Sequence, residues 1–339
     1  MQIELVIAWI MLIALTAYVL LGGADFGGGI WDLLATVSRQ KQMQRRRIRD
    51  AIGPIWEANH VWLIVVIVVM FTCFPPAFSA VMTALHVPVT LMLIGIVLRG
   101  SAFTFATYDR PGPAQDRWRR VFAWASAGTP LLLGVTLGAI ASGQLHWTDD
   151  GVYVSGFFSP WLKVFPWCVG VFTMSICALL AAVYLYVETD EEARESFRKS
   201  AIGAQITVAV MAVLTWGAAW WGAPLIASRL SSGWLNWMCI ALAVVCMIGV
   251  IANLRGRRPG QARAFAVAEV TFIVVGYGAA QFPYLVPPQF TVFNSAAAPR
   301  MLWLLLLSVL VGAVIVLPSL WYLFRVFKGQ RAFTVIDRE

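Results

Sequence analysis

Apolar residues along this chain gather into long runs that short polar connectors separate. A helix that crosses the roughly 30 Å hydrocarbon core of a bilayer needs about 20 apolar residues. Runs of this kind cover residues 3–30, 53–74, 78–105, 121–143, 163–187, 201–222, 234–253, 265–285 and 301–324. Backbone groups in lipid must pair within their own segment, and the alternating pattern of a membrane β-barrel is absent. We therefore expect about nine membrane-spanning helices.

The composition supports an all-α polytopic membrane protein. Hydrophobic residues make up 60% of the chain and charged residues 12%, with a mean hydropathy of +0.76. Soluble domains carry about 25% charged residues, so a soluble enzyme and a disulfide-stapled scaffold are excluded. The longest polar stretches, 38–50 and 106–120, are long enough only for connectors. We expect residues 1–339 to form a single integral membrane domain.

The basic residues predict how the helices are oriented. With the N-terminus outside and nine spans, all but three of the 25 Lys and Arg residues fall on the cytoplasmic side, and the exceptions are Lys163, Arg229 and Arg300. Such asymmetry is the positive-inside signal, and it predicts a cytoplasmic C-terminus. The net charge of +8 is then explained by loops that face an anionic membrane surface, so we expect membrane lipid and no nucleic acid as a partner.

Three acids inside the apolar runs are candidate functional residues, because a charge in lipid is expensive. Asp25 lies in the segment GGADFGGG, Glu57 in GPIWEANH, and Glu269 near the start of the eighth run. All three are expected toward the cytoplasmic side, where a carboxyl group can accept and release protons. The alternative is that each acid is held by an arginine or a backbone donor. We favour that alternative for Glu269, because Arg263 is close, and proton transfer for Asp25 and Glu57.

The glycines around Asp25 and the histidines suggest further hypotheses. Gly23 and Gly27 form a small-xxx-small pair, which lets a helix or a flat cofactor approach closely, and helix packing is the favoured interpretation. His60 is three residues after Glu57 and shares its helix face. A di-iron site would need a second Glu-x-x-His motif, which the chain lacks. We expect His60 to bond Glu57 or a partner chain.

Haem is the other cofactor that the histidines could hold. His60 or His86 could be an axial ligand, but the two are expected at different depths and form no pair. His146 falls in an outer loop. The five cysteines lie inside apolar runs and are expected to be buried and small. No metal site is predicted.

Several longer motifs resemble one known family. They are GADFGGGIWDLL at 23–34, the basic loop 45–49, AIGPIWEANHVWLI at 51–64, Phe103 after Arg99, and QFPYLVP at 281–287. Together they resemble subunit II of cytochrome bd-type quinol oxidases, over essentially the whole chain. The central spans, four to seven, match by hydropathy more than by residues.

The resemblance implies a bacterial inner-membrane complex that reduces dioxygen to water with quinol as substrate. Haem b and haem d are held by subunit I in this family, and subunit II binds none of them covalently. Subunit II packs against subunit I in a pseudo-symmetric heterodimer, and a small single-span subunit is a further candidate partner. The quinone type, the third haem and cyanide sensitivity cannot be inferred from the residues, although the cyanide-insensitive branch is a candidate.

The resemblance also implies roles for individual residues. The acids at Asp25 and Glu57 are implicated in proton transfer toward the haem site, although many relatives have Asp where this chain has Glu57. His60 stands where many relatives have Gln or Glu, so the resemblance assigns it no role; it is nevertheless a candidate relay partner beside Glu57. Trp56 and Asn59 lie in the same motif and are candidates for positions near the subunit interface and the haem.

Three other kinds of function stay open from the residues alone. A proton-coupled membrane transporter also uses intramembrane acids and broken helices. A self-contained b-haem carrier would need His60 or His86 as a ligand. A purely structural subunit would tolerate the loss of both Asp25 and Glu57.

Overall fold

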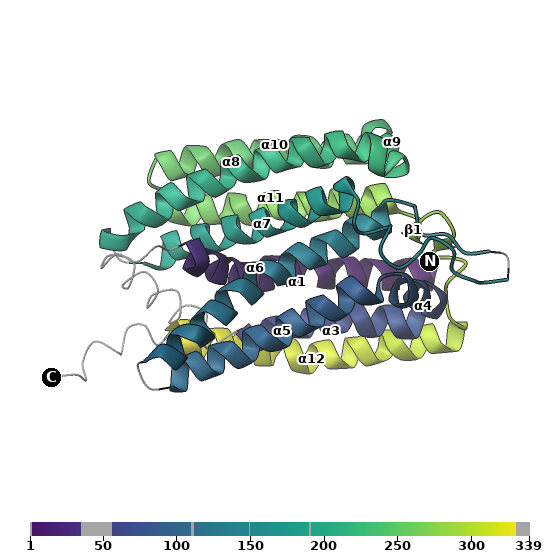
Figure 1. The fold of residues 1–339 in the computed structure, drawn as a ribbon, viewed down its shortest axis with the longest axis horizontal. Coiled ribbons are helices and arrows are strands. Elements are labelled where there is room, and N and C mark those ends of the chain that lie inside the picture. Colours follow the sequence, from purple (N-terminus) through teal and green to yellow (C-terminus); the bar gives the residue numbers. More distant parts are fainter. Residues whose placement is uncertain (1, 35–55, 110–111, 149, 190, 330–339) are drawn as a thin grey trace.

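The computed structural model describes residues 2–34, 56–109, 112–148, 150–189 and 191–329, and most of these residues are helical. The long helices lie side by side along the longest axis, with α1 near the middle (Figure 1). The helices are α1 (Ile3–Leu34), α3 (Trp56–Cys73), α4 (Pro75–Ala84), α5 (His86–Tyr108), α6 (Pro113–Ala141), α7 (Val164–Glu188), α8 (Glu191–Gly222), α9 (Pro224–Ser232), α10 (Trp234–Arg255), α11 (Pro259–Gln281) and α12 (Pro299–Gly329).

The number of helices agrees with a polytopic membrane protein. In the described residues, 8 helices are long and apolar enough to cross a membrane, or up to 9 if residues 59–73 and helix α4 count as one bent span. That pair is bent by 115°. The predicted all-helical architecture is therefore confirmed, and the orientation of the termini stays a prediction.

The third expected span, 78–105, differs from the structure. Residues 75–84 form the separate short helix α4, and α5 begins only at His86. Prolines explain both ends of α4. Pro75 and Pro76 occupy its first turn, where the missing amide hydrogen costs nothing. Pro88 lies in the first turn of α5, and in a continuous helix its ring would clash with the carbonyl of Ala84.

Two apolar clusters organise the packing. One joins α7, α8, α10 and α11 around residues such as Leu180 and Val250. The other joins the start of α1 to α3, α4, α6 and α12 around Ile7 and Phe74. Partly buried side chains of α1 also pack against the first cluster. Helix α1 is therefore the element that the two halves share.

The glycines of α1 allow this central position. A side chain added at Gly27 would collide with the carbonyl oxygen of Cys177 and with Ala181, both on α7. One added at Gly29 would collide with Ser126 on α6. The prediction that these glycines serve close helix packing is confirmed.

One end of the bundle carries the non-helical segments. The proline-rich stretch after α11 forms a small antiparallel pair, β1 (Tyr284–Val286) with β2 (Phe290–Thr291). The start of α1 lies at this same end (Figure 1). The ring of Trp147 packs against Tyr153 and Phe290 there, so the segment between α6 and α7 contacts the segment between α11 and α12.

Candidate functional site

Asp25 is buried between helices and has an amide partner. Its side chain on α1 is 9% exposed, and Asn59 on α3 is 5% exposed. The Nδ2 group of Asn59 donates a hydrogen bond to Oδ2 of Asp25 at 2.5 Å. The same amide reaches the carbonyl oxygen of Leu21 at 3.5 Å, which is a weak contact. Because Asn59 lies in the first turn of α3, this bond fixes the beginning of α3 against α1.

A buried arginine completes the site. Arg99 on α5 is 1% exposed, and its Nε donates to Oγ of Ser126 on α6 at 3.2 Å. Its guanidinium lies over the ring of Phe26, 4.8 Å from the centroid, and over Phe122 at 5.5 Å. The charges of Asp25 and Arg99 are close enough to interact. Four helices, α1, α3, α5 and α6, thus converge on one acid and one base.

Sequence reasoning did not assign Arg99 to the site. It was counted with the basic residues at the cytoplasmic end of its span, as if it were part of a loop. The available signal was its place inside the apolar run 78–105, where an arginine needs a partner. Burying two opposite charges together is costly unless their geometry is good and hydrogen bonds complete it. A pair kept at such cost is a candidate for function.

His60 faces α1 beside this pair. Its ring centroid is 6.0 Å from that of Tyr18 and 5.9 Å from that of Phe26. Glu57 and Trp56 are the first two residues of α3, one turn or less before His60, but their side chains lie outside the described part of the structure. The roles proposed for Glu57, Trp56 and His60 therefore stay predictions.

The histidines do not fit a haem-binding pair. His60 is near the beginning of α3, whereas His86 starts α5 after α3 has crossed the bundle. His86 is exposed, and its Nδ1 lies 3.1 Å from the carbonyl oxygen of Thr83. His146 is exposed in the segment between α6 and α7. Among the described residues, no three His, Cys, Asp or Glu side chains gather as a metal site would require.

Glu269 has a partner different from the one that we favoured. It is 2% exposed, and its Oε1 accepts a hydrogen bond from Nε2 of Gln205 at 2.7 Å. The preference for Arg263 was wrong: Arg263 is exposed, and six positions along a helix place two side chains on different faces. Gln205 belongs to α8, so only helix packing reveals the pair.

These features define a class of protein: a polytopic helical membrane subunit with a buried acid–base pair. Comparison with known proteins then gives the family. The family model described as cytochrome bd terminal oxidase subunit II matches residues 3–327. The chain belongs to this family, which confirms the resemblance inferred from its motifs.

Individual relatives match along nearly their full length. The chain is 23% identical over 336 residues to the putative cytochrome bd menaquinol oxidase subunit II of Bacillus subtilis, covering 93% of each. It is 24% identical over 369 residues to the cytochrome bd-I ubiquinol oxidase subunit 2 of Escherichia coli, covering 98% of this chain and 94% of the relative. The fold matches the bd oxidase structure from Geobacillus thermodenitrificans with a TM-score of 0.82 and 21% identity, covering 96% of this chain and 99% of that one.

Family membership establishes the kind of complex to which the chain belongs. The chain is a subunit of a quinol oxidase complex of the cytochrome bd type, which is a haem-containing oxidase. As a subunit II, it belongs to a complex that also contains a subunit I. This favours an oxidase subunit over the transporter alternative, although the broken pair α3–α4 is a feature that transporters share.

Proposed function

We propose that this chain supports a haem-bearing subunit I and delivers protons to it from the cytoplasmic side through Asp25 and Glu57. The observation that supports the proposal is the buried set of Asp25, Asn59 and Arg99 on three different helices. An acid that is needed only for packing would be replaced by an apolar side chain at lower cost.

The chemistry follows from the contacts of Asp25. Arg99 offsets the negative charge of the carboxylate, and the amide of Asn59 holds one of its oxygens in place. A carboxylate stabilised in this way accepts a proton when one arrives and releases it when the next acceptor is close. Glu57 and His60 begin the adjacent helix and are the proposed neighbours in the relay.

The three histidines, all of which lie in the described ranges, form no haem-ligating pair, and the proposal assigns haem b and haem d to subunit I. Those haems, when bound there, carry electrons from quinol to dioxygen. In this chain Asp25 receives and passes on protons, and Arg99 and Asn59 position it. With the N-terminus outside, proton uptake on the inner side of the bacterial membrane and quinol oxidation on the outer side would together separate charge without a dedicated pump.

The test is quinol-driven oxygen consumption by the purified complex carrying Asp25→Asn or Glu57→Gln. We expect turnover to fall at least about tenfold in each, as for the loss of an essential proton-transfer group. Haem content, measured from reduced-minus-oxidised spectra, should stay normal. Glu269→Gln is the matched control, because it neutralises a buried acid outside the site. Normal turnover in both test variants would refute the relay, and loss of haem would make these acids structural.

A further inference from the structure

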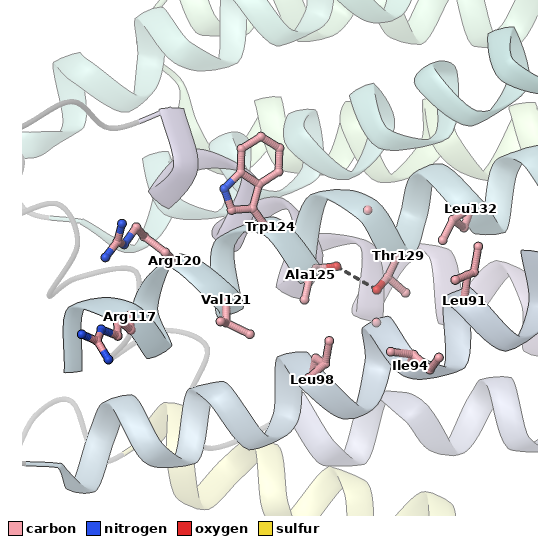
Figure 2. Close-up of a pocket in the computed structure, with 12 residues that line it drawn as sticks. Leu91, Ile94, Leu98, Arg117, Arg120, Val121, Trp124, Ala125, Thr129 and Leu132 are labelled. Carbon is pink, nitrogen blue, oxygen red and sulfur yellow. Dashed lines mark hydrogen bonds between the residues drawn. The ribbon is translucent and has the colours of Figure 1, made fainter. Parts of the chain in front are cut away.

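An elongated groove lies between α5 and α6, apart from the buried acid–base pair. Its volume is about 800 Å³, within the range of about 300–1,000 Å³ that small-molecule sites span. Apolar side chains of α5 form one wall, including Leu91, Ile94 and Leu98. Val121, Ala125 and Leu132 of α6 belong to the opposite wall, and Figure 2 shows the two rows facing each other.

The two ends of the groove differ in chemistry. Arg117 and Arg120 lie at one end, whereas Leu91 and Leu132 lie at the other (Figure 2). The two arginines are three residues apart, so they share a helix face. Both are exposed, and no acidic side chain of the described residues forms an ion pair with them. The nearby acid, Asp116, is paired with Arg119 at 3.4 Å.

The length and the level of the groove suit one lipid molecule. Twelve residues of helix separate Arg120 from Leu132, which is about 18 Å along the axis. One leaflet of the hydrocarbon core is about 15 Å thick. Trp124, one turn beyond Arg120, is 67% exposed beside the groove. A tryptophan next to arginines is typical of the membrane–water boundary. The arginine end of the groove therefore lies at the depth of the lipid headgroups.

We propose that this groove binds an anionic glycerophospholipid, with its phosphate at Arg117 and Arg120 and an acyl chain along the apolar walls. Charge selects this occupant. A neutral isoprenoid or a neutral lipid would fill the apolar length but leave both guanidinium groups without a counter-ion. An apolar helix of the partner subunit would leave them without one too. A lipid phosphate supplies the charge and the chain in one molecule.

The floor of the groove offers a way to block it. Gly128 lines the groove, and a Cβ atom added there would meet nothing within 4 Å, so we expect the side chain of Gly128→Leu to extend into the groove. Gly217 on α8 also has nothing within 4 Å of an added side chain, and Gly217→Leu is the matched control. For the charges, Arg117→Gln with Arg120→Gln is the test. Arg119→Gln is the control on the same helix.

The experiment titrates the delipidated oxidase complex with phosphatidylglycerol or phosphatidylcholine and follows bound lipid by native mass spectrometry. Each basic residue at an anionic headgroup is worth about fivefold in affinity. We therefore expect phosphatidylglycerol to bind about 30-fold more weakly to the double arginine variant, and phosphatidylcholine, whose phosphate charge is balanced by its own choline, to lose less. Gly128→Leu should weaken both lipids, and the two controls should match the wild type.

Four results would overturn the proposal. Equal binding of the two lipids to the wild type, or unchanged phosphatidylglycerol binding to the double arginine variant, would remove the role of the charges. Loss of subunit I from Gly128→Leu with unchanged lipid binding would show that protein covers the groove. Retention of quinone by the wild type and its loss from Gly128→Leu, with phosphatidylglycerol unaffected, would show a neutral occupant.

Discussion

Among the described residues, each half of the molecule buries one acid, and the two acids have different partners. Around α1, α3, α5 and α6, Asp25 has the amide of Asn59 and the charge of Arg99. Around α8 and α11, Glu269 has the amide of Gln205. Oε2 of Glu269 and Oε1 of Gln205 have no hydrogen-bond partner among the described residues. An amide cannot neutralise a carboxylate charge. Adding a proton to Glu269 would therefore remove an unpaired charge, whereas adding one to Asp25 would leave the charge of Arg99 unpaired.

This difference, more than burial alone, supports Asp25 as the proposed proton-transfer residue. Both acids are inside apolar helices, and both are among the three acids that sequence reasoning singled out. Only Asp25 lies where several helices bring an acid, a base and a histidine together. The half that contains Glu269 packs instead around the uninterrupted apolar cluster of α7, α8, α10 and α11.

The largest expected effect comes from removing the charge of Arg99. In Arg99→Met, Asp25 would stay buried without its cation, and breaking a buried pair costs about 3–5 kcal/mol. Thermal unfolding of the purified complex measures the loss. The double variant with Asp25→Asn should recover a large part of it, because neither charge is left alone. If the two single losses simply add in the double variant, the charges are not coupled.

A smaller loss is expected where α1 meets α7. In Gly27→Ala, the new methyl group collides with the Cys177 carbonyl, and overpacking of this kind costs about 1–3 kcal/mol. Gly203→Ala is the control, because an added methyl group there meets nothing within 4 Å. The two variants are compared by thermal unfolding in the same detergent. Equal stability would show that the close approach of α1 and α7 is not needed.

The smallest effect is expected from Glu269→Gln. The amide keeps the shape of the side chain and can still accept the hydrogen bond from Gln205. We expect stability to change by less than about 1 kcal/mol and oxygen consumption to stay within about twofold of the wild type. A loss of turnover as large as that of Asp25→Asn would place a second proton path in this half and end the contrast between the two.

The visible spectrum of the chain tests separately whether the haems are bound by the partner subunit. Purified alone, the chain should show no haem bands in a dithionite-reduced minus air-oxidised spectrum, because His60 and His86 form no pair across the bundle. Bands of b and d type should appear only when the partner subunit is co-expressed. A haem signal from the chain alone, lost in His60→Ala, would make His60 a ligand.

Much of the fold could be predicted from the sequence, because lipid demands long apolar runs and leaves few alternatives to helices. The break between α4 and α5 was missed, although Pro88 signals it. Partners were harder to predict than helices. Asn59 is 34 residues from Asp25, and Gln205 is 64 residues from Glu269. Nothing local in the sequence indicates which faces of distant helices meet, so Arg99 was placed with the loops and Glu269 with Arg263.

The most direct measurement is proton uptake by the complex in liposomes after an oxygen pulse, followed with a pH-sensitive dye on the cytoplasmic side. If Asp25 carries protons, Asp25→Asn should slow uptake at least about tenfold, with normal haem content, and Glu269→Gln should match the wild type. Uptake at the wild-type rate in Asp25→Asn would contradict the proposal, because protons would then reach the partner subunit without this acid.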